Sequence, residues 1–309
     1  MVYLLLLFGF ALLVFSGRIL ITSSVSIARR FHLPPFLIGL TVVAIGTSAP
    51  ELLVSLTGAI KGHADLAVYN VIGSNISNVL LVLAIAAMIL PIPVQARTFW
   101  VDWSAMLFFS LILFVFLLDL SFSMYEGLLI LCLLTGFVLF SVYRHRGHPP
   151  KNDVESEQLQ RLGTAILMVV VSSGGLTLGA DLLVDNAVIL AREFGVSQRI
   201  ISVSLIAVGT SIPELTTSAI AVFRKQTDIS IGNIIGSNIF NLGFVLGITT
   251  VVSPLRVNPL ILSFDIYWLL GIALILMGLL LIPPKFMLSR WKGLVMLSVY
   301  LIYLYLVLK

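Results

Sequence analysis

The amino-acid sequence predicts an all-α membrane protein, with ten transmembrane helices in two inverted-topology five-helix repeats. Its 309 residues are 59% hydrophobic and only 10% charged, whereas a soluble domain carries about 25% charged residues. Ten apolar runs are long enough to cross a bilayer, which takes about 20 residues in a helix. Polar motifs in the second and third runs recur in the seventh and eighth, which indicates an internal duplication.

These apolar runs define the expected helices. The first run has no charged segment before it and no small-residue cleavage site after it, so we expect a retained helix and not a signal peptide. Residues 1–144 form the expected first half and residues 163–309 the second, joined by a polar cytoplasmic linker at 145–162. The helices are expected at residues 2–22, 36–60, 65–90, 101–119, 124–143, 163–187, 198–222, 228–252, 264–282 and 291–308.

The second expected helix contains the hexapeptide Gly46-Thr47-Ser48-Ala49-Pro50-Glu51, and the seventh contains Gly209-Thr210-Ser211-Ile212-Pro213-Glu214. Proline cannot donate to the helical ladder and its ring clashes with the preceding turn, so we expect a kink or an unwound turn between Thr47 and Glu51. An ionised side chain at the bilayer centre costs at least ~2.5–3.5 kcal/mol. A glutamate kept at this depth in both halves is therefore a candidate functional residue.

The third expected helix carries a second polar stretch, Asn70 to Asn78, and the eighth carries its copy, Asn233 to Asn241. Small and hydrogen-bonding side chains of this kind favour close packing between membrane helices. In both motifs the second copy follows the first by 163 positions. Five helices, an odd number, separate the copies, so the second copy enters the membrane from the opposite side. Inverted repeats are typical of secondary transporters, whose binding sites lie near the midplane.

The other acidic residues are expected at solvated or capping positions. Asp102, Asp119 and Glu126 fall near the ends of the fourth and fifth helices, where we expect contact with water. Asp65 and Asp228 precede the third and eighth helices, where we expect them to cap the helix N-terminus.

The distribution of lysine and arginine predicts that both termini lie outside, because cytoplasmic loops carry an excess of these residues. We therefore interpret the excess of basic residues behind the net charge of +4 as a signal of orientation in a membrane, and not as a sign of a nucleic-acid partner. In this orientation the twelve cytoplasmic basic residues are Arg29, Arg30, Arg97, Arg144, Arg146, Lys151, Arg161, Arg224, Lys225, Lys285, Arg290 and Lys292. The five on the opposite side are Lys61, Arg192, Arg199, Arg256 and Lys309.

The chemistry of the two hexapeptides points to a hard cation. If the two halves bring Glu51 and Glu214 together, the like charges repel unless a cation lies between them. Ca²⁺ takes six to eight oxygen ligands in flexible geometry, and the carbonyls near Thr47 and Thr210 supply further oxygens. The four histidines all fall in expected loops, which argues against a softer metal. Because an empty site leaves two bare carboxylates, we expect Ca²⁺ to leave only in exchange for Na⁺ or protons.

Neutral oxygens flank the two glutamates and suit Na⁺. We expect no prosthetic group, with Ca²⁺ and Na⁺ as the transported ions. The residues that supply these oxygens are Ser48, Ser74, Asn78, Ser211, Ser237 and Asn241.

The duplicated Gly-Thr-Ser-x-Pro-Glu and Gly-Ser-Asn-Ile-x-Asn motifs resemble the α-repeats of the Na⁺/Ca²⁺ exchangers in the calcium/cation antiporter superfamily, and most closely its short bacterial inner-membrane members. The resemblance implies that Glu51 and Glu214 coordinate Ca²⁺ with the carbonyls of Thr47 and Thr210, and that the first and sixth helices form a sliding gate. Asn241 stands where several relatives, including K⁺-dependent ones, have aspartate. The resemblance also implies Na⁺ ligands at Ala44, Ser48, Ser74, Asn78, Ala207, Ser211, Ser237 and Asn241.

Three other functions are weighed against Na⁺/Ca²⁺ exchange. A Ca²⁺/H⁺ antiporter would use the same two glutamates, since a carboxylate binds protons as well as metals. A channel would need a continuous pore and no counter-ion. An intramembrane hydrolase using Ser48 or Ser211 would need a base such as His or Lys at the same depth, and the sequence offers none there. The sequence leaves the oligomeric state open.

Overall fold

The computed structural model describes residues 1–145, 159–195 and 209–308. In these ranges the regular secondary structure is helical apart from four two-residue strands that form two antiparallel pairs, β1 with β4 and β2 with β3. The strands are β1 (Ile92–Pro93), β2 (Ser121–Phe122), β3 (Leu255–Arg256) and β4 (Met287–Leu288).

Most described helices lie within a few residues of the expected apolar runs, but the first helix continues to Arg30 instead of ending at 22, and the sixth continues to Glu193 instead of ending at 187. The first half contains α1 (Val2–Arg30), α2 (Pro35–Ile38), η1 (Gly39–Val43), α3 (Ala44–Thr47), α4 (Ala49–Ile60), α5 (Ala64–Ser77), η2 (Asn78–Val82), α6 (Leu83–Ile89), α7 (Ala96–Phe116), η3 (Leu117–Asp119) and α8 (Met124–His145). The second half contains α9 (Leu162–Glu193), α12 (Ile212–Phe223), α13 (Thr227–Phe240), η5 (Asn241–Val245), α14 (Leu246–Val252), η6 (Ile261–Asp265), α15 (Ile266–Leu281) and α16 (Arg290–Leu308). Of the η elements, η1, η2, η5 and η6 are π-helical and η3 is a 3₁₀ turn.

Eight helical stretches of the described ranges are long and apolar enough to cross a membrane, and the bent pair Pro35–Thr47 and Ala49–Ile60 forms a further candidate span. Helix α12 is a shorter apolar helix, so the expected helix 198–222 is described only in its C-terminal part. Most of the expected linker at 145–162 also lies outside the described residues.

The same sequence of elements occurs twice along the chain. Helices α4, α5, η2 and α6 correspond to α12, α13, η5 and α14, and each element of the second set begins and ends 163 positions after its counterpart. Strands β1 and β3 have the same separation. The duplicated polar motifs therefore lie in duplicated local structures.

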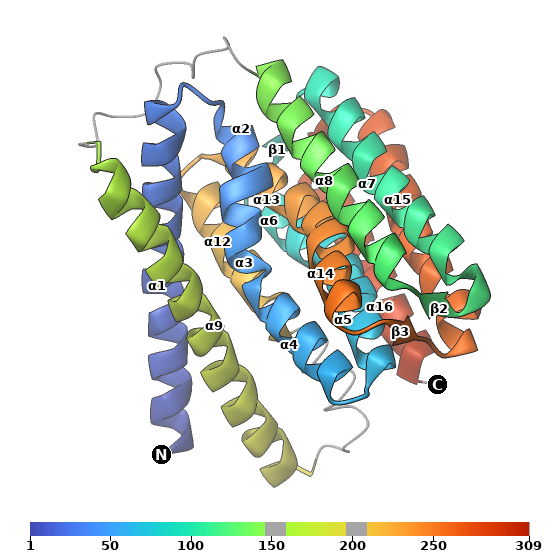
Figure 1. The fold of residues 1–309 in the computed structure, drawn as a ribbon. Helices are drawn as coiled ribbons and strands as arrows, with labels where there is room; N and C mark the ends of the chain where they lie inside the picture. Colours follow the sequence, from blue (N-terminus) through green and yellow to red (C-terminus); the bar gives the residue numbers. More distant parts are fainter. Residues whose placement is uncertain (146–158, 196–208, 309) are drawn as a thin grey trace.

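Helices α1 and α9 lie side by side along one flank of the bundle and run in opposite directions (Figure 1). They cross closely, because a Cβ added at Gly9 would lie 3.0 Å from the carbonyl oxygen of Gly179. Helices α7, α8, α15 and α16 form the opposite flank, and the elements that carry the polar motifs lie between the two flanks (Figure 1). The beginning of α1 and the end of α16 both lie at the lower edge of the molecule in this view.

Glycines set the contact between α13 and the first part of the bent pair. A Cβ added at Gly39 would lie 2.5 Å from the carbonyl oxygen of Ile229, and one at Gly236 would lie 2.7 Å from the Cα of Leu40. Such short distances mean that the two backbones touch, as small residues allow in membrane helices. Hydrogen bonds between side chains on these segments depend on this approach.

Three expectations for acidic residues are wrong. Asp102 is not solvated, because only 1% of its surface is exposed. Asp65 does not cap α5, whose N-cap residue is His63; its Oδ1 instead accepts a hydrogen bond of 2.6 Å from the main-chain N–H of Asn258. Asp228 does not cap α13, whose N-cap residue is Gln226, and lies in the first turn of that helix. Asp119 is exposed, as expected. The buried position of Asp102 results from packing between helices, which the sequence of one helix does not reveal.

Turns at the ends of the helices also use charged side chains. Glu126 accepts hydrogen bonds of 2.7 Å from both the main-chain N–H and the hydroxyl of Ser123, which caps the start of α8. Lys292 is fully buried, and its Nζ donates to the carbonyls of Ile282, Pro284 and Met287 at 2.7 to 2.9 Å. A lysine satisfied in this way stabilises the turn between α15 and α16.

The glycine contact predicts a position-dependent effect of adding one methyl group. Gly236→Ala should lower the thermal stability of the purified protein in detergent, because overpacking against the Leu40 backbone costs about 1–3 kcal/mol. Gly271→Ala is the matched control, since no atom of the described chain would lie within 4 Å of its Cβ and alanine favours helix over glycine by about 1 kcal/mol. Equal melting temperatures for the two variants would contradict the close approach.

Candidate functional site

The two hexapeptides form matching breaks in the helices. Ser48, between α3 and α4, has φ −82° and ψ 7°, and Ser211, before α12, has φ −87° and ψ 4°. The bend at the first break is 44°, which confirms the expected kink. In each copy the proline lies in the first turn of the following helix, and its missing N–H leaves the carbonyl four residues earlier without its usual helical donor.

Glu51 and Glu214 lie in the first turns of α4 and α12, and both are fully buried. The N-terminus of a helix carries a partial positive charge that favours a nearby carboxylate. The two carboxylates are close enough to interact electrostatically. None of their four oxygens has a hydrogen-bond partner among the described residues.

Hydroxyl groups line the space around the two carboxylates. Ser74 approaches the carboxylate of Glu51, and Thr47, Ser48 and Ser237 approach that of Glu214. These contacts lack the geometry of full hydrogen bonds, since the carboxylate oxygens remain without partners in the described chain.

Two hydroxyl pairs connect the halves and are related by the same repeat. The hydroxyls of Thr47 and Ser237 are 3.2 Å apart, and those of Ser74 and Thr210 are 3.1 Å apart. Each pair joins a residue of one break to the polar helix of the other half. The predicted residues Thr47, Thr210, Ser74 and Ser237 therefore lie together in the structure.

The remaining predicted residues divide into two groups. Ser48, Asn78, Ser211 and Asn241 are buried, and their side-chain polar atoms have no hydrogen-bond partner in the described part of the chain. Ala44 is fully buried at the start of α3, whereas Ala207 lies outside the described residues. Asn78 and Asn241 begin the π-helical turns η2 and η5. Such turns occur frequently at functional sites, and the sequence motifs did not predict them.

Asn75 and Asn238 form a reciprocal bridge between the two polar helices. The Nδ2 of Asn75 donates to the main-chain carbonyl of Asn238 at 3.2 Å, and the Nδ2 of Asn238 donates to that of Asn75 at 3.3 Å. Both residues are buried. This symmetric contact joins α5 to α13.

Sequence reasoning did not assign a role to Asn70 or Asn233, which open the two polar stretches. The Nδ2 of Asn70 donates to the main-chain carbonyl of Glu51 at 3.1 Å and to the Ser55 hydroxyl at 2.9 Å. The Oδ1 of Asn233 accepts a hydrogen bond of 3.2 Å from the Thr47 hydroxyl. Their recurrence at the repeat spacing was the signal that could have identified them.

Asn233 also forms hydrogen bonds within the second half of the chain. Its Nδ2 donates to the hydroxyls of Thr217 and Ser218 on α12 at 3.1 and 3.2 Å. Through the Oδ1 contact with Thr47, this one side chain therefore connects α3, α12 and α13 around the break.

The site contains two carboxylates, several hydroxyls and two amide side chains with free oxygens, all buried. Buried polar atoms are nearly always hydrogen-bonded in folded proteins. At this site both copies of Ser48, Glu51 and Asn78 have polar side-chain atoms without a partner in the described chain, and both carboxylates are among them. Oxygen groups gathered in this way suit a hard cation.

The asparagine bridge predicts coupled effects on stability. Asn75→Ala and Asn238→Ala should each lower the melting temperature in detergent, because each removes a buried hydrogen bond that is worth about 0.5–1.5 kcal/mol. The double variant should lose less than the sum of the two, since residues in direct contact show interaction energies of about 0.5–3 kcal/mol. Strict additivity in this double-mutant cycle would argue against the bridge.

Comparison with known proteins identifies the family of the chain. The family model described as sodium/calcium exchanger protein matches residues 1–143 and 164–309. The chain is 37% identical to the putative antiporter CaxA of Alkalimonas amylolytica, over 97% of this chain and 96% of that protein. It is 30% identical to the sodium/calcium exchanger MaX1 of Methanosarcina acetivorans, over 98% and 97% of the two chains.

Solved structures of the sodium-calcium exchanger NCX_Mj have the same fold. One of them, soaked with 10 mM Na⁺ and zero Ca²⁺, superposes with a TM-score of 0.81 at 30% identity and covers 98% of each chain. The resemblance seen in the duplicated motifs is thus confirmed at the level of the whole chain. This protein belongs to the sodium/calcium exchanger family and is a cation antiporter of the multi-pass membrane type.

Proposed function

We propose that this antiporter exchanges Ca²⁺ for Na⁺ at a midplane site built around Glu51 and Glu214. The observation that carries the proposal is the pair of fully buried carboxylates whose oxygens have no partner in the described chain. Removing two carboxylates from water costs several kcal/mol per ion unless opposite charge compensates it. A divalent cation between them supplies that charge.

The proposed Ca²⁺ ligands are the two glutamates together with the carbonyls of Thr47 and Thr210. The hydroxyls of these threonines bond to serines of the opposite half, and this contact holds each break against the other half. Family membership supports the choice of ion, because the matching family is that of sodium/calcium exchangers.

The proposed Na⁺ sites flank the Ca²⁺ site and use neutral oxygens. Unpartnered side-chain atoms in both copies of Ser48 and Asn78 support this assignment. Asn241 supplies a neutral oxygen where relatives can have a carboxylate. The proposed site therefore has two central carboxylates, those of Glu51 and Glu214. The full proposed set is Ala44, Ser48, Ser74, Asn78, Ala207, Ser211, Ser237 and Asn241.

Transport is proposed to follow alternating access between two inverted repeats, 1–144 and 163–309, that contribute ten transmembrane helices and are joined by a cytoplasmic linker at 145–162. The recurrence of the elements at one spacing and the opposite directions of α1 and α9 support the inversion (Figure 1). Helices α1 and α9 pack mainly on each other, as a gate that slides across the core requires. The Arg224 guanidinium donates to the Thr22 hydroxyl at 2.7 Å, so sliding of α1 must break this contact.

The proposed location is the prokaryotic inner membrane, with both termini outside. An inner membrane protein of Escherichia coli, YrbG, is 36% identical to this chain over 88% of this chain and 86% of that protein, which supports the location. The excess of basic residues in the proposed cytoplasmic loops supports the orientation.

Replacing either glutamate should abolish exchange. In proteoliposomes with an imposed Na⁺ gradient, Glu51→Gln and Glu214→Gln should reduce Ca²⁺ flux to the level of empty liposomes, because one remaining carboxylate cannot neutralise a divalent ion. Glu126→Gln, which alters a carboxylate that caps α8, is the control and should retain flux. Normal Na⁺-driven flux in Glu51→Gln would refute the site.

A measurement of Ca²⁺ binding tests the proposed site independently of transport. Ca²⁺ should raise the melting temperature of the unmodified protein, because a ligand that binds only the folded state stabilises it by about 2.7 kcal/mol at one hundred times its Kd. Glu214→Gln should lose this shift, whereas Glu126→Gln should keep it.

A Ca²⁺/H⁺ antiporter is the second candidate. It is favoured by one observation, namely that the carboxylate oxygens have no donor in the described chain, so protons could neutralise them between Ca²⁺ binding events. We expect Ca²⁺ flux to require Na⁺ and to be absent under a pH gradient alone. Flux driven by the pH gradient in Na⁺-free buffer would favour the second candidate instead.

A further inference from the structure

The two broken helices carry the same glutamate but a different residue three positions after it. Val54 follows Glu51 on α4, and Thr217 follows Glu214 on α12. Val54 is 37% exposed, whereas Thr217 is fully buried. Valine and threonine have similar volumes, and they differ in that threonine carries a hydroxyl. The second half therefore has a buried hydrogen-bonding group at a position where the first half has none.

The Thr217 hydroxyl lies between its own helix and the polar helix of the same half. It donates to the main-chain carbonyls of Pro213 at 2.9 Å and Glu214 at 3.1 Å, and it accepts a hydrogen bond of 3.1 Å from the Nδ2 of Asn233. A hydroxyl has one proton and two acceptor lone pairs, so these contacts can exist together. Thr217 thus ties Asn233 to the turn of α12 that carries the carboxylate.

Asn233 fixes the direction of the hydrogen bonds on its other side. Its Oδ1 accepts a bond of 3.2 Å from the Thr47 hydroxyl, whose proton is shared with the carbonyl of Ala44 at 3.3 Å. Because a hydroxyl has a single proton, Thr47 must accept from Ser237, whose hydroxyl is 3.2 Å away. All of these side chains are buried. The four that form hydrogen bonds, here called the Thr217 network, are Ser237, Thr47, Asn233 and Thr217.

In the first half the equivalent asparagine makes a different contact. The Nδ2 of Asn70 donates directly to the main-chain carbonyl of Glu51 at 3.1 Å. In the second half the Thr217 hydroxyl stands between the corresponding amide and carbonyl. Val54 has no hydroxyl to take that place. The identity of this one residue therefore explains why the two asparagines bond differently.

The threonine of the second break also lacks the equivalent contact with an asparagine. The Thr210 hydroxyl is 3.1 Å from that of Ser74, as that of Thr47 is near Ser237. Among the residues that the structure describes, however, no hydrogen bond joins Thr210 to Asn70. The network that crosses from one break to the other is thus built once, around Thr217.

We propose that Thr217 is a positioning residue for Ca²⁺ binding, because its hydroxyl completes the network that holds Thr47 of one half in place relative to Glu214 of the other. This inference rests on the proposed function, in which the Thr47 carbonyl and the Glu214 carboxylate bind the same ion. Groups that hold metal ligands in position raise the affinity for the metal. A buried polar network whose members are all satisfied is rigid enough to do so.

Removing the hydroxyl should weaken Ca²⁺ binding selectively. Thr217→Val keeps the volume of the side chain but removes the acceptor for Asn233, so the Kd for Ca²⁺ should rise about threefold to tenfold, as expected for the loss of one hydrogen bond. The Kd for Na⁺ should stay the same, because the contact of Ser237 with Thr47 does not need Thr217 and the other proposed Na⁺ ligands lie outside the network. Thr217→Ser retains the hydroxyl and should restore the Kd for Ca²⁺.

The measurement is the melting temperature of the full chain in detergent against the concentration of Ca²⁺ or of Na⁺, which gives a Kd for each ion. An unchanged Kd for Ca²⁺ in Thr217→Val would overturn the proposal. So would an equal rise in both Kd values, because a general loss of packing would weaken the binding of both ions alike.

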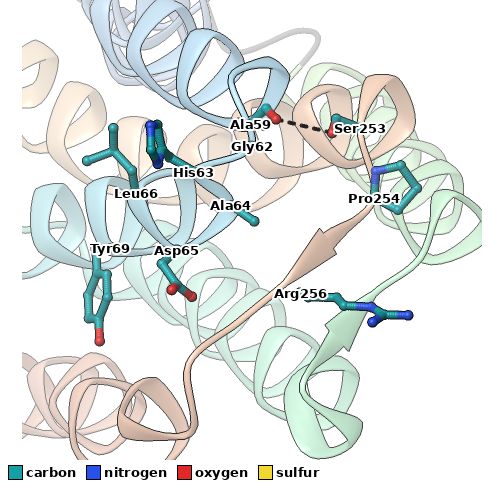
Figure 2. A pocket seen from close by; sticks show the side chains of 10 residues that line it. All are labelled: Ala59, Gly62, His63, Ala64, Asp65, Leu66, Tyr69, Ser253, Pro254 and Arg256. Atoms are coloured by element: carbon teal, nitrogen blue, oxygen red, sulfur yellow. Dashed lines mark hydrogen bonds between the residues drawn. The ribbon is translucent and has the colours of Figure 1, made fainter.

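Two control variants remove hydrogen bonds outside the network. Thr135→Val removes a hydroxyl that donates to the carbonyl of Leu131, one turn earlier on α8, at 2.8 Å. Ser253→Ala removes a bond of 3.4 Å to the carbonyl of Ala59. Figure 2 shows this bond at the far end of α4, beside an open pocket of about 730 Å³. Both controls should leave the Kd for Ca²⁺ unchanged, and a rise as large as that of Thr217→Val would overturn the proposal.

A double-mutant cycle in buffer without Ca²⁺ or Na⁺ tests the network itself. Thr217→Val and Asn233→Ala should each lower the melting temperature, and the double variant should lose less than the sum, because residues in contact are coupled. Thr217→Val and Ser253→Ala share no partner and should be additive. Additivity of Thr217→Val with Asn233→Ala would overturn the proposal. If Ca²⁺ does not raise the melting temperature of the unmodified protein, the proposed function fails, while the cycle still decides whether Thr217 holds Asn233.

Discussion

The structure depends on two carboxylates that are buried without hydrogen-bond partners among the residues that the structure describes. Glu51 and Glu214 are fully buried, and their carboxylates repel each other electrostatically. Neither carboxylate accepts a hydrogen bond from the described chain. The ends of two broken helices and a group of hydroxyls surround them. Burying two carboxylates together is costly unless positive charge compensates them, and this cost is the basis of the proposed cation exchange.

The hydrogen bonds around the site explain how two halves of one chain form a single site. Thr47 bonds to Ser237 and Ser74 to Thr210, so each half supplies the partner for the break of the other. The bridge between Asn75 and Asn238 joins the two polar helices directly. Because these bonds cross from one half to the other, neither half could form the site alone.

Much of this arrangement could be predicted from residue patterns. Pro50 after a Gly-Thr-Ser sequence indicated the kink, and the constant spacing of the motifs indicated equivalent positions in the two halves. Other features could not be predicted. The π-helical turns at Asn78 and Asn241 carry no known residue signature, and the sequence placed Asp102 near a helix end, where an acidic residue is usually solvated.

The sequence by itself determined that the protein spans a membrane, that it contains a duplication, and that Glu51 and Glu214 are candidate functional residues. Hydropathy, motif spacing and a charge inside an apolar run can each be read directly from the chain. The tertiary structure decided which polar atoms have partners. Asn233 contacts Thr47 and Asp65 contacts Asn258 only when distant segments pack together. Burial and hydrogen-bond satisfaction depend on the whole surroundings of a side chain, and those surroundings arise only when the helices assemble.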